Sequence, residues 1–129
     1  MNKILVEVSV GELLDKISIL EIKQEKIKDP KKLKFINEEH AILKDQLNQN
    51  VKSDDKLDTL FQALKEINAK LWVIEDDKRL CEKNSDFTEN FIKLSRDVHF
   101  FNDDRAKIKL EMNNHTGSKI KEIKEYTSY

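Results

Sequence analysis

LWVIEDDKRLCE, residues 71–82, places apolar side chains on two faces of one predicted helix. A 3.6-residue period traced back from it gives a first apolar row at Leu57, Leu60, Leu64, Ile67, Leu71 and Ile74. A second face carries Trp72, Val73, Asp76 and Leu80. A helix that is apolar on two faces needs neighbours on both sides or a partner subunit. We therefore expect this helix to be the central element of the fold.

Length and composition indicate one domain built from long helices. A chain of 129 residues suits a single core, so we expect one domain over residues 1–129. Hydrophobic and charged residues each make up 38% of the chain, and it contains only 2 Gly and 1 Pro. Sheets and tight turns need more of these two residue types. The composition predicts an all-α bundle of about four helices.

The first two helix boundaries follow from capping residues and proline. Ser9 and Glu12 form an S-x-x-E capping box, which predicts the start of the first helix. Asp29-Pro30 ends that helix, because proline disfavours helical geometry in the residue before it, and Pro30 suits the first turn of the second helix. We expect the second helix to end near Leu47, before a polar connection at 48–55.

The remaining helices are predicted in the same way. Ser53, Asp54 and Asp55 bring a cap and negative charge to the start of the third helix, which runs to about Asn84. A capping pattern at Asp86 and Glu89 begins the fourth helix, and Gly117 is the expected stop. The short connection 84–86 implies that the third and fourth helices lie antiparallel and side by side.

The N-terminal stretch has the pattern of a short strand. Ile4, Val6, Val8 and Val10 alternate with Leu5, Glu7 and Ser9, a period of two in mostly β-branched residues. A single strand needs a partner, which would be the C-terminal tail or the same strand from another subunit. The alternative is an extended lead-in that packs its valines on the helices.

Charged residues interrupt the apolar rows of both long helices. In the fourth helix Arg105 is the only charge in the row Phe87, Phe91, Leu94, Val98, Phe101, Arg105, Ile108 and Met112. We expect Arg105 to pair with Glu75 or Asp76, since an unpaired charge in such a row would be costly and a guanidinium matches a carboxylate. The candidate ligand-binding residues of this polar layer are Glu75, Asp76, Arg79, Arg96, His99, Asp103 and Arg105.

Charge and cysteine content limit the partners. The 24 Lys and Arg nearly cancel the 25 Asp and Glu, so the overall charge predicts neither a nucleic acid nor a membrane as partner. Cys81 is the only cysteine, which excludes an intramolecular disulfide and favours the cytoplasm. Cys81 and His40 both fall on helical rows and are interpreted as core or boundary residues. The chain contains neither a membrane-length apolar run nor a signal peptide pattern.

Three motifs resemble an uncharacterised bacterial family catalogued as a domain of unknown function. They are GELLDKISILEIK at 11–23, LWVIEDD at 71–77 and NDDRA at 102–106. The resemblance covers most of the chain and implies a small helical bacterial protein with a link to surface-glycan metabolism. It carries no established activity and no catalytic residues to transfer.

Two kinds of function remain open from the sequence. The first is a homo-oligomeric binding or accessory module, without metal or cofactor, that takes a small anionic ligand at the polar layer. The alternative is a small all-α enzyme. It would hold Mg²⁺ with carboxylates, as helical nucleotide pyrophosphohydrolases do, or clamp substrate carboxylates with arginines, as chorismate mutase does. The Glu-Glu-x-x-Glu element of the first class is absent, because Glu38-Glu39 is followed by His40-Ala41-Ile42.

Overall fold

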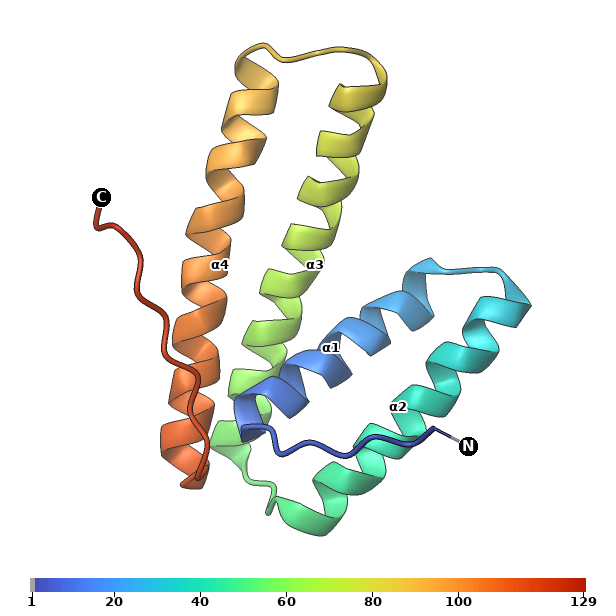
Figure 1. The fold of residues 1–129 in the computed structure, drawn as a ribbon, viewed down its shortest axis with the longest axis vertical. Helices are drawn as coiled ribbons and strands as arrows, with labels where there is room; N and C mark the ends of the chain where they lie inside the picture. Colours follow the sequence, from blue (N-terminus) through green and yellow to red (C-terminus); the bar gives the residue numbers. More distant parts are fainter. Residues whose placement is uncertain (1) are drawn as a thin grey trace.

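The computed structural model describes residues 2–129 and contains four α-helices. They are α1 (Val10–Lys26), α2 (Pro30–Asn50), α3 (Asp55–Lys83) and α4 (Glu89–Thr116), with no strand among the described residues (Figure 1). The prediction of an all-α bundle of four helices is confirmed. Between residues 2 and 129, no helix combines the length and apolar character needed to cross a membrane.

The four helices form two antiparallel hairpins that meet at one end and diverge at the other. α3 and α4 lie side by side, and α1 leaves their shared end at an angle with α2 running back along it (Figure 1). α1 packs against each of the other three helices, whereas α2 packs along α1. The expectation that the helix containing residues 71–82 is central is therefore wrong, because α1 occupies that place.

Burial explains why α1 is central. Its buried residues spread over most of its circumference, and they are Gly11, Leu13, Leu14, Asp15, Ile17, Ser18, Leu20 and Ile22. A helix buried over so much of its surface must have neighbours on several sides, and among residues 10–24 only Lys16 is exposed. α2 has no buried residue, so it covers one side of α1 and faces solvent elsewhere.

The hydrophobic core lies where the two hairpins join. Its buried centre is formed by Leu14 of α1, Leu57 and Leu64 of α3, and Met112 of α4. Partly buried residues pack around this centre: Val10, Leu47, Val51, Leu60, Phe61 and Ile108. Apolar burial at this one end holds the hairpins together, and the opposite end of α3 and α4 extends beyond it.

Most of the predicted helix ends are confirmed. Ser9 Oγ accepts a hydrogen bond from the Glu12 N–H at 3.0 Å and caps α1. Asp29 caps α2, with Pro30 in its first turn, and the Asp54 carboxylate accepts from the Leu57 N–H at 2.8 Å at the start of α3. These side chains satisfy N–H groups that have no partner inside the helix.

The ends of α2 and α4 differ in detail. α2 continues to Asn50, past the predicted end at Leu47. The N-cap of α4 is Thr88 rather than Asp86, which instead accepts a hydrogen bond from the Thr88 N–H at 3.2 Å within the turn. Gly117 ends α4 as predicted, in a left-handed conformation with φ of 69°.

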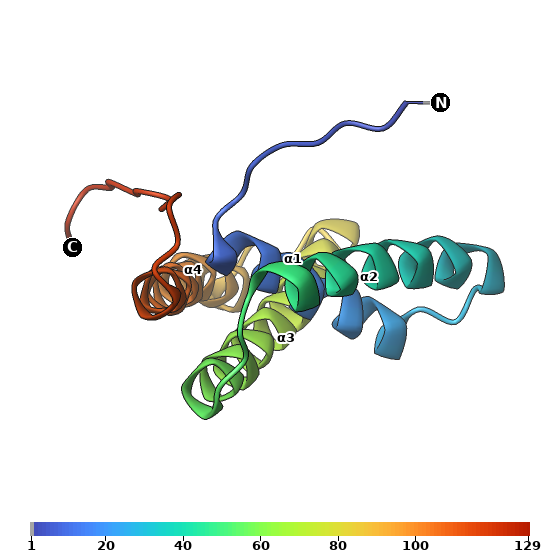
Figure 2. The ribbon, with the colours of Figure 1, turned by 90° about the horizontal axis from the view of Figure 1, so that it is seen from below.

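Neither chain end forms a strand with another described segment. Residues 2–8 are extended and project away from the helices, and Val6 is 74% exposed (Figure 2). The alternative of a lead-in packed on the helices is thus wrong for this residue. The C-terminal segment leaves α4 in a different direction (Figure 2), and near the bases of the two segments Ser118 Oγ accepts from the Val10 N–H at 3.2 Å.

Candidate functional site

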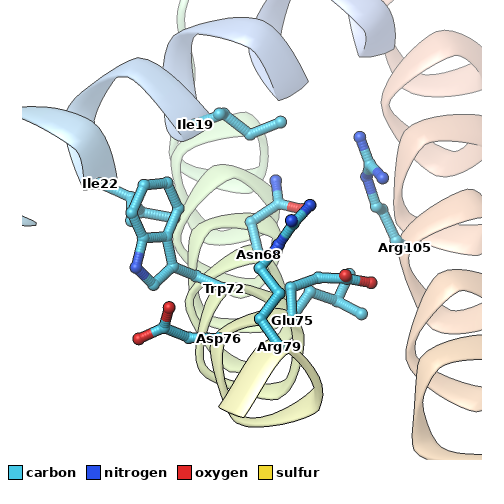
Figure 3. Close-up of a pocket in the computed structure, with 9 residues that line it drawn as sticks. Ile19, Ile22, Asn68, Trp72, Glu75, Asp76, Arg79 and Arg105 are labelled. Atoms are coloured by element: carbon cyan, nitrogen blue, oxygen red, sulfur yellow. The ribbon is translucent and has the colours of Figure 1, made fainter. Parts of the chain in front are cut away.

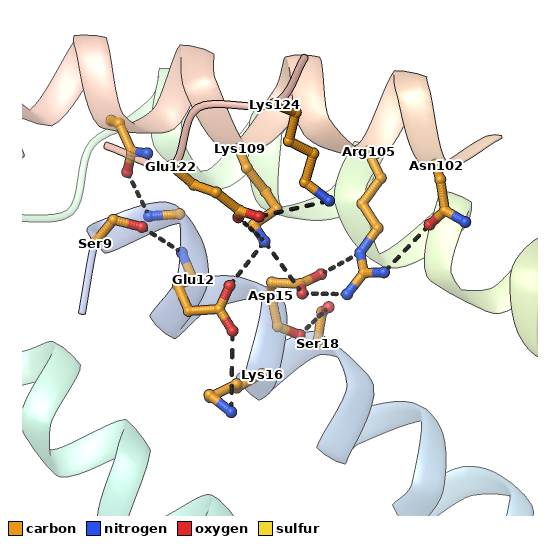
Figure 4. A network of polar contacts seen from close by, with 12 residues as sticks. Ser9, Glu12, Asp15, Lys16, Ser18, Asn102, Arg105, Lys109, Glu122 and Lys124 are labelled. Atoms are coloured by element: carbon orange, nitrogen blue, oxygen red, sulfur yellow. Dashed lines mark hydrogen bonds and ion pairs between the residues drawn. The ribbon is translucent and has the colours of Figure 1, made fainter. Parts of the chain in front are cut away.

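A buried carboxylate on α1 connects three helices. Asp15 is 1% exposed and accepts two hydrogen bonds from Arg105 of α4, from Nε at 3.0 Å and from Nη2 at 2.5 Å (Figure 4). Asn68 of α3 donates to the same carboxylate at 2.9 Å. A guanidinium binds a carboxylate in this two-pronged manner with defined geometry, so Asp15 sets how α1 and α4 sit relative to each other.

A second cation extends this arrangement toward the C-terminal tail. Lys109, which is 7% exposed, places Nζ 2.8 Å from Glu12, 3.1 Å from Glu122 and 3.7 Å from Asp15. Within residues 2–129, every buried side-chain nitrogen and oxygen has a hydrogen-bond partner. We call Glu12, Asp15, Asn68, Arg105, Lys109 and Glu122 the ion-pair network; each of its buried polar atoms has a hydrogen-bond partner within the protein.

The pKa values in this network move in the directions that favour its charges. Burial alone would raise the pKa of Asp15, but the hydrogen bonds from Arg105 and Asn68 and the nearby positive charges hold it below its ordinary value. For Lys109, burial alone would lower the pKa. The hydrogen bond to Glu12 and the charge of Asp15 outweigh burial, so the pKa of Lys109 lies above its ordinary value. Asp15 and Lys109 are therefore ionised at neutral pH.

The network corrects the predicted pairing of Arg105. Its guanidinium binds Asp15 rather than Glu75 or Asp76, because α1 packs against both α3 and α4 and places Asp15 beside Arg105. Asp15 was missed by the sequence analysis. One sequence signal pointed to its burial. Gly11, Asp15, Ser18 and Ile22 follow one another at spacings of four, three and four, which places them on one face of the helix, and all four are buried.

Next to this network is a cavity of about 310 Å³ between α1, α3 and α4. Its apolar side is formed by Ile19 and Ile22 of α1 with Leu71 and Trp72 of α3, and Arg105 projects from α4 across from them (Figure 3). We call this cavity the Trp72 pocket; it is lined by Ile19, Ile22, Asn68, Leu71, Trp72, Glu75, Asp76, Arg79 and Arg105. Four of the seven predicted site residues, Glu75, Asp76, Arg79 and Arg105, thus come together.

The polar groups of the Trp72 pocket are of two kinds. Asn68 and Arg105 are held in place by Asp15 and form a fixed wall. Glu75, Asp76 and Arg79 are exposed, and none of them forms an ion pair with another residue in the range 2–129. A pocket with an apolar side, a fixed polar wall and exposed charged side chains has the composition of a small-molecule site.

The other three predicted residues lie elsewhere on α4. His99 and Asp103 line a second cavity with the C-terminal tail, where the Tyr129 hydroxyl donates to Asp103. The guanidinium of Arg96 lies 5.9 Å from the centre of the Phe100 ring. The predicted polar layer is wrong in this part, because these side chains face the tail and solvent instead of α3.

His40 and Cys81 were considered for metal binding and nucleophilic catalysis, and both pack within the helical bundle. Within residues 2–129, no three His, Cys, Asp or Glu side chains are placed to hold a metal ion. His40 Nε2 lies 3.0 Å from Glu21 Oε2 and packs between α2 and α1, and Cys81 is buried at 5% exposure. The interpretation of both as core or boundary residues is confirmed.

Comparison with known proteins gives a family but no relative of established function. A model described as a family of unknown function (DUF6165) matches residues 4–129. No curated protein and no solved structure matches the chain. The match covers nearly the whole chain, including all four helices and the Trp72 pocket.

Proposed function

The chain belongs to this family of unknown function, and we propose that it is an oligomeric binding module that takes a small anionic ligand in the Trp72 pocket. One observation carries the proposal. Exposed charged groups border an apolar pocket that also contains Asn68 of α3 and Arg105 of α4, both held in place by the buried Asp15. A site fixed on one side can orient a ligand at little cost in conformational entropy.

The charges at the pocket define the ligand class. Arg105 already satisfies Asp15, so Arg79 is the cation available to an acidic group of the ligand. Glu75 and Asp76 lie nearby and would repel further negative charge. The ligand should therefore carry one acidic group at Arg79 and an apolar face against Trp72. A volume of about 310 Å³ suits a small molecule.

A sugar acid fits this description, because the C–H face of a pyranose packs on an indole while its single carboxylate binds a guanidinium. The proposed link to surface-glycan metabolism in a bacterial cytoplasm rests on the family resemblance and on this chemistry. It directs the choice of test ligands.

Trp72 makes the test direct, since it is the only tryptophan in the chain. We propose titrating the protein with sugar acids, sugar nucleotides, free nucleotides and Mg²⁺ while recording tryptophan fluorescence and the thermal midpoint. A ligand of the proposed class should change both in a saturable manner. Arg79→Met should abolish the change, whereas the matched variant Arg96→Met, outside the pocket, should keep it. Equal responses of the two variants would contradict the assignment of the pocket.

The alternative function is a small all-α enzyme at the same pocket. The observation in its favour is that Glu75 and Asp76 lie beside Arg79, so acids and a cation meet at one cavity. Binding is favoured over catalysis because the most buried charges are already paired within the ion-pair network, Asp15 with Arg105 and Lys109 with Glu12 and Glu122. Turnover of a ligand that also shifts Trp72 fluorescence, lost in Glu75→Gln, would establish the enzyme instead.

The oligomeric part of the proposal rests on exposed apolar residues. Val73 and Leu80, on the outer face of α3, are 48% and 55% exposed, and Ile4 and Leu5 are more exposed still. Burial between subunits would remove this apolar surface from water. Light scattering over a micromolar concentration series tests it, and a monomer throughout would contradict it.

A further inference from the structure

Residues 2–8 form an extended segment that lacks internal partners. Ile4, Leu5 and Val6 are 84%, 80% and 74% exposed. No backbone N–H or C=O of residues 2–8 has a hydrogen-bond partner among the described residues. A row of such groups flanked by exposed β-branched side chains is a template for pairing with another strand.

The base of this segment is held firmly. Ser9 caps α1, the Val10 N–H donates to Ser118 Oγ, and the Gly11 N–H donates to Asn113 Oδ1 at 2.7 Å. The segment leaves the body of the protein from these contacts and points away from the helices (Figure 2). A strand presented from a fixed base loses less entropy on pairing than a free peptide would.

We propose that residues 2–8 pair with the same residues of a second copy, antiparallel, in the register that places Lys3 opposite the partner's Glu7. This inference deepens the proposed function, because it rests on the proposed oligomeric state and names the surface that joins the copies. The pair would be isologous: a two-fold axis passes through Leu5, which faces the partner's Leu5.

The charges select this register. Opposite residues in an antiparallel pair share one face, so Lys3, Leu5 and Glu7 of both copies lie together and Ile4, Val6 and Val8 lie on the other face. A shift by two residues would put Lys3 or Glu7 opposite Leu5. A shift by one would mix the faces and place Glu7 opposite the partner's Ile4. Only the proposed register forms two Lys–Glu pairs.

The C-terminal tail is the less suitable partner for this segment. Glu122 is bound to Lys109 and Lys124, and Tyr129 is bound to Asp103, so the tail is engaged along α4. The tail and the N-terminal segment also leave their common base in different directions (Figure 2). A second copy of residues 2–8 has neither of these obstacles: its backbone groups are unpaired within the described residues, and it can approach from outside the protein.

Charge reversal with rescue tests the register. Lys3→Glu or Glu7→Lys would each set two like-charge pairs across the two-fold axis, and we expect the dimer dissociation constant to rise about 4- to 30-fold by sedimentation. Combining Lys3→Glu with Glu7→Lys restores opposite charges, so the constant should return to within about threefold of the wild type. Lys32→Glu, an exposed change on α2, is the matched control and should have no effect.

Disulfide trapping gives an independent readout of the same register. In a Cys81→Ala background, Leu5→Cys should form a covalent dimer with itself under mild oxidation. Ile4→Cys and Val6→Cys chains, carrying different tags, should cross-link to each other far more than each to itself, because like positions lie diagonally, at roughly 7–8 Å.

The outcomes distinguish a failure of the strand pairing from a failure of the proposed oligomeric state. A dimer that ignores Lys3→Glu and cross-links at random would overturn the strand pairing and leave the oligomeric module standing. A chain that stays monomeric at every concentration would overturn both. If the Leu5→Cys thiol instead cross-links to a cysteine engineered into the tail, the tail is the partner and the proposal is overturned.

Discussion

The Asp15 carboxylate of α1 and the Arg105 guanidinium of α4 lie 90 positions apart in sequence and are joined by two hydrogen bonds. Asp15 is almost fully buried, and the Arg105 side chain is 28% exposed. The pair couples the first hairpin to the second at the wall of the Trp72 pocket. Stability and the shape of the pocket therefore depend on the same contact.

Arg105→Met should destabilise the fold by about 3 kcal/mol. Truncating one partner of a buried pair typically costs about 3 to 5 kcal/mol, because the remaining charge stays buried. The lower value applies since Arg105 is partly exposed and Lys109 lies 3.7 Å from Asp15. Urea denaturation measures the change in unfolding free energy.

Two further variants make the Arg105 experiment decisive. Asp15→Leu combined with Arg105→Met removes both charges and should recover much of the loss, as apolar replacement of a buried pair often does. Arg96→Met, a change of the same type on the surface of α4, should shift stability by less than about 0.5 kcal/mol. Equal losses at Arg96 and Arg105 would show that the buried pair has no special role.

The pKa shift of Asp15 predicts a loss of stability in acid. Its folded-state pKa lies below the ordinary value, so its ionised form contributes stability above the unfolded-state pKa of about 4. That contribution should disappear as the pH falls from about 4 through the lower folded-state value. Urea midpoints from neutral pH down to about pH 2.5 measure it. Asp15→Asn should be less stable at neutral pH and should lose less in acid; parallel curves would contradict the assignment.

The raised pKa of Lys109 predicts a loss of stability at high pH. Its folded-state pKa is raised, so the charged form contributes stability below about pH 10.4 that is lost as the pH rises through the folded-state value. Lys109→Met should remove this alkaline step. Lys32→Met, on the exposed face of α2, is the control that should leave the step unchanged.

Gly11→Ala should destabilise the protein, although alanine usually favours a helix over glycine. A Cβ at this position would lie 2.6 Å from the Lys109 carbonyl oxygen and 3.1 Å from Asn113 Oδ1. Backbone atoms cannot rotate away, so α1 and α4 must separate at a cost of roughly 1–3 kcal/mol. The thermal midpoint should fall, and binding of the proposed ligand at the Trp72 pocket should weaken. A rise in the midpoint would contradict the close helix contact.

Ser9→Ala should cost roughly 0.5–2 kcal/mol, the usual range for losing an N-cap. The Ser9 hydroxyl accepts from the Glu12 N–H, and the serine is 4% exposed, so water cannot replace the bond readily. Ser128→Ala in the exposed tail is the control. An unchanged urea midpoint for Ser9→Ala would show that the cap contributes little.

Local sequence patterns were sufficient to predict the helices. The caps at Ser9 and Asp54, Pro30 and Gly117 act within a few residues, and the structure places helix ends at or beside each of them. Helical periodicity also identified Leu57, Leu64 and Met112 as core residues. These properties depend on backbone geometry and on a single helix face, so they can be read without knowing the neighbours.

Residue patterns alone thus established an all-α bundle, its four helices and the gathering of Glu75, Asp76 and Arg79 on one helix. Three-dimensional packing was needed to show that α1 is central and that Arg105 binds Asp15 instead of an acid of α3. The reason is that periodicity specifies which side of a helix is buried but not which helix lies against it. That choice depends on close approach, here made by Gly11 against Lys109, which brings Asp15 within reach of Arg105.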